Sequence, residues 1–442
     1  MGLGFLTLII LYKILWIKNF HNFIFWALAY QWTNVNVKTI YAPLIGSDFL
    51  SLHKFPDHII QAWAYSNIDL IVVAIGFRLM AGKSILFSSS DVLFKIDLKK
   101  FSNYYIIFSI LTLTILNPYI YSASIQQILY QFTYLKYALF FIGFSNILKH
   151  NDYKNRLNYY FIFEFLLSFS GYFSSFKDYL MIVFIVYIYV NSNKFGLKQY
   201  LFGTIAIFIG FNLGVIWCEI KIEYRTFLTK GEVIQANKRD INESLTFLYE
   251  RINSIDANQY QDGIDQFIDR LEYIDYFSAC IGYVPQNKPH QNGKTFSDAL
   301  LYGFQPRFLF PDKEILDDSK YTSEYTGLIL AGKDEATSIS LGYCPDGYID
   351  FGENLFFITP LLFGMLIGGV YKILVKKANN QLWGLAITLP LFYMINNFGN
   401  IFNKMLPPVM YYSVVAYLFL QYGLKYLKLD INNKETHFTS IA

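Results

Sequence analysis

Apolar runs of 15 to 20 residues recur along the chain, separated by short polar stretches that carry Lys and Arg. Runs of about 20 apolar residues are typical of membrane-spanning helices. The pattern predicts 10 to 12 spans, the weakest of which is interrupted by polar side chains at residues 23–40. The runs cover residues 3–17, 23–40, 59–79, 104–119, 130–148, 158–173, 179–190, 200–217, 355–374, 382–397 and 408–427.

One long polar segment, residues 219–354, interrupts this series. Apolar residues recur at three- and four-residue steps over 245–255 and 264–274, which predicts two amphipathic helices. From residue 284 onward Pro, Gly and Asn indicate loops with short helices. We therefore expect an all-α polytopic membrane protein with N-terminal spans at 1–217, a mainly helical polar segment at 218–354, C-terminal spans at 355–428 and a tail at 429–442.

Composition and charge place that segment outside the cell membrane. The chain is 54% hydrophobic and only 16% charged, whereas soluble domains carry about 25% charged residues. Residues 219–354 hold 13 Lys or Arg against 23 Asp or Glu, which leaves 23 against 10 elsewhere. Because basic loops stay cytoplasmic, the acidic segment is predicted to be periplasmic and the C-terminus cytoplasmic. Nucleic acid is not an expected partner of so acidic a segment.

The chain holds three cysteines, Cys218, Cys280 and Cys344, all in or beside the polar segment. A Cys280–Cys344 disulfide in an oxidising periplasm and three buried thiols are the two alternatives. No Cys or His spacing is typical of a zinc or haem site, and no acidic cluster indicates another metal. We therefore expect no metal and no cofactor.

Two groups of cations mark the edges of the polar segment. Lys221 and Arg225 are four residues apart and would share one helix face beside Tyr224. Arg307 and Lys313 flank an apolar turn between two prolines. Both groups suit phosphate oxygens, which guanidinium binds bidentately. The alternatives are basic side chains that extend to the membrane interface and an interfacial anchor.

Two aspartates lie next to the returning span. Asp346 and Asp350 are found around Tyr348 in a glycine-rich stretch. A carboxylate within reach of an acceptor hydroxyl is what a general base requires. Helix capping is the alternative role.

Four stretches together resemble the Wzy-type O-antigen or capsular repeat-unit polymerases. They are residues 217–225, 304–313, 337–342 and 348–352, in the order in which that family shows a Lys-x-x-Tyr-Arg, a Pro-Arg before a Pro-x-Lys-Pro, a Thr-Ser-x-x-x-Gly and a Glu-x-Tyr-x-Asn-Phe-Gly. The chain departs from this pattern at Glu314, where a proline is expected, at Asp346, where a glutamate is, and at Asp350, where an asparagine is.

The resemblance implies a GT-C-like, metal-independent glycosyltransferase of the bacterial inner membrane. Such an enzyme transfers a growing glycan from undecaprenyl pyrophosphate to an incoming lipid-linked repeat unit, in some systems alongside a chain-length regulator protein. It implies Asp346 as the base, Tyr348 as the residue that positions it, and Arg307 as the stabiliser of developing charge. The phosphate-binding candidates are Arg225, Lys221, Tyr224, Lys313, Lys177 and Arg251.

Two other functions fit parts of this pattern. An O-antigen ligase uses the same donor but transfers the glycan to the lipid A–core. A lipid-linked oligosaccharide flippase or other transporter would carry short loops and charges near mid-bilayer. Charge here is concentrated in one external segment instead, which favours an enzyme.

Overall fold

Every regular element that the structure describes is helical, and the described part of the chain contains no strand. The structure is a computed structural model, and it describes residues 2–16, 23–82, 98–116, 123–150, 154–168, 176–191, 196–232, 238–331, 338–378 and 381–427. The predicted tail at 429–442 lies outside these residues. The helical fold class is therefore confirmed at this coarse level.

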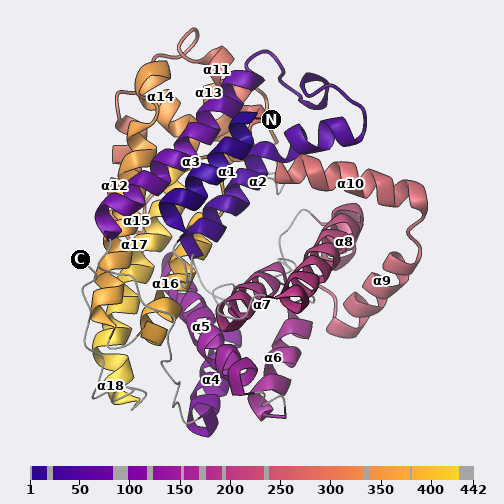
Figure 1. The fold of residues 1–442 in the computed structure, drawn as a ribbon, viewed down its shortest axis with the longest axis vertical. Coiled ribbons are helices and arrows are strands. Elements are labelled where there is room, and N and C mark those ends of the chain that lie inside the picture. Colours follow the sequence, from indigo (N-terminus) through magenta and orange to yellow (C-terminus); the bar gives the residue numbers. More distant parts are fainter. Residues whose placement is uncertain are drawn as a thin grey trace. The chain divides into compact units, whose positions relative to one another are not determined.

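The chain divides into two compact units, the first comprising residues 1–143, 273–330 and 339–442 and the second residues 144–272 and 331–338. Figure 1 shows the helices coloured along the sequence. The first unit holds α1 (Gly2–Leu15), α2 (Phe23–Leu44), η1 (Leu50–Leu52), α3 (Ile59–Ala81), α4 (Leu98–Leu113), most of α5 (Ala123–His150), α11 (Asp275–Tyr283), α12 (Lys294–Phe304), α13 (Asp318–Thr326), α14 (Tyr343–Leu355), α15 (Ile358–Lys377), α16 (Gln381–Ile395), α17 (Phe402–Leu418), η4 (Phe419–Gly423) and α18 (Leu424–Tyr426). The second holds the end of α5 with α6 (Arg156–Leu167), α7 (Phe176–Asn191), α8 (Leu197–Thr229), α9 (Ile241–Asn253) and α10 (Ala257–Leu271).

Three of the described helices have the length and composition needed to cross a membrane: Ile59–Ala81, Gly203–Thr229 and Ile358–Lys377. Shorter apolar helices occupy Gly2–Leu15, Tyr179–Asn191 and Leu382–Ile395. The chain is thus compatible with a membrane protein, and the number of spans stays a prediction. The boundary predicted at residue 217 falls inside α8, which continues to Thr229.

Helices α3 and α15 form the most extensive helix pair of the first unit (Figure 1). Glycines let the two backbones touch: a Cβ on Gly364 would lie 2.3 Å from the Val73 carbonyl oxygen, and one on Gly368 would lie 2.4 Å from the Phe77 carbonyl oxygen. Small residues four apart are a common device of packed membrane helices. Both contacts advance by four residues on each helix, so α3 and α15 run parallel.

Candidate functional site

Helix α14 places Asp346 in its first turn, where the helix dipole favours an acid. The helix begins after Gly342, whose φ of +97° is in the region that favours glycine. Gly347 brings the next chain segment close, because a Cβ there would lie 2.2 Å from the Phe356 carbonyl oxygen. Asp346 is consequently buried, with 2% of its surface exposed.

Two donors hold the Asp346 carboxylate. The Tyr321 hydroxyl donates to Oδ1 at 2.7 Å and the Phe402 amide to Oδ2 at 3.1 Å. Burial raises the pKa of Asp346 from 3.8 to about 7, with a smaller contribution from the Asp350 and Asp318 carboxylates, while the two hydrogen bonds oppose the rise. A pKa near 7 suits a general base at neutral pH. Tyr321 is only half-buried and so links this carboxylate to the surface.

Asp350 has a different role, which the sequence left open between base and cap. It accepts hydrogen bonds from the Thr295 amide at 3.0 Å, the Thr295 hydroxyl at 2.6 Å and the Phe296 amide at 3.2 Å. These are first-turn groups of α12, which lack partners within their own helix. Asp350 therefore caps α12 from another helix, and its buried carboxylate is fully engaged.

Tyr348 does not position Asp346 as predicted. Its hydroxyl donates to the Val284 carbonyl oxygen at 3.1 Å, and its ring lies 5.6 Å from that of His290. Residues two apart on a helix do not face each other, so Tyr348 and Asp346 point to different surroundings. The tyrosine hydroxyl that contacts the Asp346 carboxylate is that of Tyr321.

Arg307 is buried to 7% exposure and donates to neutral oxygens. Its guanidinium donates to the carbonyl oxygens of Lys313 and Glu314, both at 2.7 Å, and to the Tyr302 hydroxyl at 3.2 Å. Its amide donates to the Gln127 side chain at 3.1 Å. These hydrogen bonds fix the turn that carries Arg307.

Lys313 completes a pair of cations. Its ammonium donates to the Gln305 carbonyl oxygen at 2.7 Å and to that of Tyr302, and it lies 3.2 Å from the Tyr302 ring centroid. Burial, reinforced by the charge of Arg307, lowers its pKa from 10.5 to about 8. Within the described residues neither Lys313 nor Arg307 forms an ion pair. Two adjacent cations without a carboxylate favour an anionic ligand.

Large apolar side chains surround this cation pair and are 45–69% exposed. They are Leu301, Phe304, Phe308, Leu309, Phe310 and Ile315. Exposed apolar patches of this kind mark interaction sites, including membrane interfaces. The patch suits a phosphate attached to a lipid chain.

The predicted catalytic residues do not gather at one point. Asp346 and Asp350 belong to the N-terminal end of α12, and Arg307 follows its C-terminal end. An 11-residue helix is about 16 Å long. The two candidate groups are therefore separated by roughly the length of α12.

The second unit uses its predicted site residues mainly for packing and local pairing. Tyr224 is fully buried in a core with Ile220, Leu228 and Leu248, so it is not available to a substrate. Arg251 pairs with Glu223 at 2.5 Å and lies 3.9 Å from Glu219, which neutralises it.

Three further candidate residues, Lys221, Arg225 and Lys177, keep their status as predictions, as does the Thr-Ser motif. Lys221 and Arg225 lie one turn apart on α8 and are half-buried. The Lys177 side chain and Thr337 of the predicted Thr-Ser motif lie outside the described residues.

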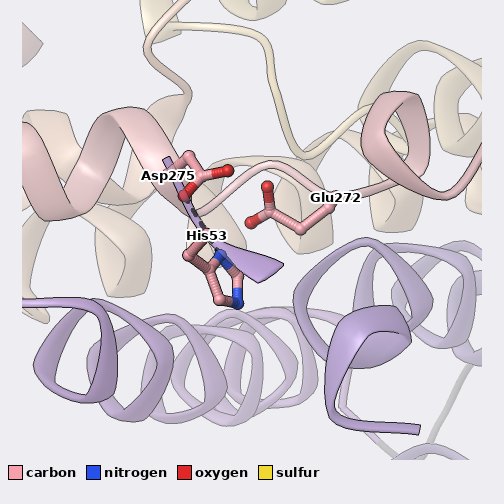
Figure 2. Close-up of side chains that lie close together, drawn as sticks. All are labelled: His53, Glu272 and Asp275. Atoms are coloured by element: carbon pink, nitrogen blue, oxygen red, sulfur yellow. Dashed lines mark hydrogen bonds and ion pairs between the residues drawn. The ribbon is translucent and has the colours of Figure 1, made fainter. Parts of the chain in front are cut away.

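A buried polar group that the sequence did not reveal joins His53 to Asp275, 222 residues further along the chain. Figure 2 shows these two side chains, which both belong to the first unit. The His53 Nδ1 lies 3.1 Å from the Asp275 carboxylate, which also pairs with the Lys38 ammonium at 3.3 Å. That ammonium already supplies a cation to Asp275, so the group is explained by internal pairing.

The three cysteines are free, buried thiols, and the Cys280–Cys344 bond is not formed.

Comparison with known proteins gives one match. The model of a family described as a domain of unknown function, DUF8712, matches residues 70–429. No curated protein and no solved structure matches the chain. The matched range contains both ends of α12, together with Asp346 and Arg307.

Proposed function

The chain belongs to the DUF8712 family, and we propose that it is a membrane glycosyltransferase that polymerises glycan repeat units carried on undecaprenyl pyrophosphate. The observation that carries this proposal is the Arg307–Lys313 pair, which has no carboxylate partner in the described residues and lies in an exposed apolar patch. A lipid pyrophosphate offers both the anion and the hydrocarbon that such a surface would bind. The resemblance to Wzy-type polymerases supplies the reaction.

The proposed chemistry begins with the acceptor hydroxyl. Its oxygen attacks the anomeric carbon of the donor glycan, and the bond from that carbon to the donor pyrophosphate breaks, with the electron pair leaving on the pyrophosphate. The acceptor proton passes to Tyr321 as the Tyr321 proton passes to Asp346 along their 2.7 Å hydrogen bond. The pKa of about 7 lets Asp346 take that proton near neutral pH.

The length of α12 favours one assignment of the cations. A base and the leaving pyrophosphate act on the same anomeric carbon, so they cannot be about 16 Å apart. Arg307 and Lys313 therefore suit the acceptor pyrophosphate, whose repeat unit would extend along α12 and present its far hydroxyl to Tyr321. For the donor pyrophosphate, Arg225, Lys221 and Lys177 are the candidates.

The proposed location is the bacterial inner membrane, with α11 and α14 on the periplasmic side. The parallel helices α3 and α15 end at basic residues, Arg78 in one and Lys376 and Lys377 in the other. Basic residues mark cytoplasmic ends, and α11 and α14 adjoin the opposite end of α3 through His58 and Tyr65. A reporter that is active only in the periplasm, inserted after the exposed Gln261, tests the predicted periplasmic location of residues 219–354. An inactive reporter at this position would contradict that location.

The test of the reaction is the length of glycan made by a strain that lacks the gene and is complemented with variants. The wild-type gene should restore a ladder of polymer on a gel, and Asp346→Asn should leave single repeat units at equal membrane protein level. The control is Asp298→Asn, which removes an exposed carboxylate on α12 and should restore the full ladder. A deletion strain that makes no surface glycan at all would indicate a ligase. An unchanged ladder in the deletion strain would refute glycan transfer.

A further inference from the structure

Asp69 is a charged residue type in the middle of an apolar helix. It lies in α3, a candidate membrane span, and is completely buried. Among the described residues neither carboxylate oxygen is held by an N–H or O–H donor. The polar group beside it is the Cys344 thiol of α14, which is a weak donor.

Two more buried oxygens without partners belong to the same region. The Ser66 hydroxyl stands three residues before Asp69, on the same helix face. The other is the Thr359 hydroxyl, in the first turn of α15. Because Val73 touches Gly364 and Phe77 touches Gly368, the parallel register places Asp69 level with residue 360, next to Thr359.

The groups that face Asp69 provide no compensating charge. From α14 they are the titratable side chains Tyr343 and Cys344, both fully buried. In the described part of the chain no Lys or Arg forms an ion pair with Asp69. An ionised carboxylate without a partner in an apolar interior is strongly unfavourable.

We propose that Asp69, together with Ser66 and Thr359, binds a small monovalent cation, which is either a proton or a sodium ion. Both neutralise the carboxylate, and sodium would also use the two hydroxyl oxygens, since hard cations take oxygen ligands. Ionisable residues inside membrane helices typically mark ion sites and pathways. This site lies beyond the proposed glycan transfer, whose chemistry requires no cation at Asp69.

The experiment compares the thermal unfolding of full-length wild-type protein and Asp69→Asn in detergent, from acid to alkaline pH, in potassium or sodium buffer. If a proton binds, the folded protein retains a proton that the unfolded chain releases, so the wild-type midpoint should fall by a few degrees as the pH rises. Asp69→Asn, which mimics the neutral form, should lose the part of this dependence that Asp69 contributes, keep the part that arises from Asp346, and unfold at a higher temperature than wild type at alkaline pH. If sodium binds, sodium should raise the alkaline midpoint of the wild type and not that of Asp69→Asn.

Asp57→Asn is the matched control, since it removes an exposed carboxylate just before α3 and should keep the wild-type pH and sodium responses. A lower midpoint of Asp69→Asn by the same amount at every pH and in both salts would show a paired, ionised Asp69 and overturn the proposal.

Should Asp69→Asn fail to fold, dicyclohexylcarbodiimide labelling of the wild type replaces it. This apolar reagent modifies protonated carboxyl groups, so labelling at Asp69 supports the site, and protection by sodium but not potassium identifies the ion. No labelling of Asp69 at acid or neutral pH in sodium-free buffer would refute it.

Discussion

The two ends of α12 carry charges of opposite sign, and the hydrogen-bond partners of these charges differ. At the N-terminal end one carboxylate, Asp350, accepts three hydrogen bonds from Thr295 and Phe296. At the C-terminal end two cations, Arg307 and Lys313, donate to carbonyl oxygens and to Tyr302. The N-terminal end is complete in itself, whereas the C-terminal end has an excess of positive charge.

The helix dipole explains the sign of the charges but not the excess. Acids favour helix N-termini and cations favour C-termini, each by about 0.3–1 kcal/mol at exposed sites. One cation would suffice for that purpose, and the charge of the second, Arg307, adds to the burial that lowers the pKa of Lys313. Residues that work against local stability in this way are typical of binding sites. The comparison therefore separates Asp350, whose charge completes the end of a helix, from the Arg307–Lys313 pair, whose charge is left for a ligand.

Among the residues at the C-terminal end of α12, removal of Arg307 should have the largest effect on activity. If its guanidinium anchors the acceptor pyrophosphate, Arg307→Ala should lower kcat/KM for the lipid-linked acceptor by about 10–100-fold, equivalent to about 1.5–3 kcal/mol for a lost hydrogen bond to a charged group. Arg307→Lys should fail nearly as badly because the planar fork is lost. Polymerisation is measured on purified protein in nanodiscs with lipid-linked repeat unit.

The control for that prediction is an arginine that has a carboxylate partner. Arg239 pairs with Glu243 at 3.4 Å, four residues away on the surface of the second unit. Arg239→Ala should leave the rate unchanged, since exposed pairs contribute about 0–1 kcal/mol even to stability. Equal losses in Arg239→Ala and Arg307→Ala would remove the distinction between paired and unpaired cations.

Asp350→Ala should act on stability instead. It would leave the buried first-turn donors of α12 without an acceptor, at a cost of about 1–3 kcal/mol, and the thermal midpoint should fall accordingly. Asp350→Asn keeps one acceptor oxygen and should cost less. Asp298→Ala, on the exposed face of the same helix, should stay within about 0.5 kcal/mol of wild type. Loss of polymer in Asp350→Asn protein of normal stability would instead make Asp350 the base.

The sequence predicted where the helices lie in the chain better than where each helix ends or which residues of different helices are in contact. Residues 59–79 and 355–374 were expected to be spans, and the structure has Ile59–Ala81 and Ile358–Lys377. The boundary predicted at residue 217 falls inside α8, because hydropathy changes there while helical hydrogen bonding continues to Thr229. Hydrophobicity thus locates an element but does not say where the backbone stops being helical.

The candidate site was accessible from sequence only where residues are close in the chain. Arg307 and Lys313 were found because two prolines and an apolar turn frame them. Tyr321 was missed because it reaches Asp346 from 25 residues away and is one of 37 tyrosines. The capping of α12 by Asp350 spans 55 residues and left no local signal. Spacing therefore identified charged groups, and tertiary contacts decided their roles.

The pH dependence should report both ends of α12 at once. Asp346 must be ionised to accept a proton, so the polymerisation rate should rise as the pH rises through about 7. Lys313 must be charged to hold an anion, so the rate should fall above pH about 8. One pH unit beyond either limit should lower the rate about tenfold. Lys313→Arg should extend the alkaline side, because arginine stays protonated. An alkaline limit that Lys313→Arg leaves in place would assign it to another group.

Ionisation of Asp346 should have the opposite effect on stability: the free energy of unfolding should fall as the pH rises, whereas the polymerisation rate should rise. Because its pKa is about 7 in the folded protein and 3.8 ordinarily, the folded chain holds a proton that the unfolded chain releases. Its contribution to stability is full below pH about 4 and is lost as the pH rises to about 7. Asp346→Asn should remove the part of the dependence that Asp346 contributes, so its thermal midpoint should fall less with rising pH than that of the wild type, and an unchanged series would show that Asp346 is ionised throughout.

The smallest effect should come from Tyr302→Phe. This change removes the hydroxyl that accepts from Arg307 at 3.2 Å but keeps the ring that Lys313 approaches to 3.2 Å from the centroid. The guanidinium retains its two carbonyl acceptors. One hydrogen bond of this kind is worth about 0.5–1.5 kcal/mol. We therefore expect the KM for the lipid-linked acceptor to rise a few-fold with little change in kcat.

Tyr302→Leu, which also removes the ring beneath Lys313, should raise KM further. If Tyr302→Phe instead abolished kcat, the hydroxyl itself would have to contact the reacting groups, and the C-terminal end of α12 would be the site of bond making rather than an anchor for the acceptor.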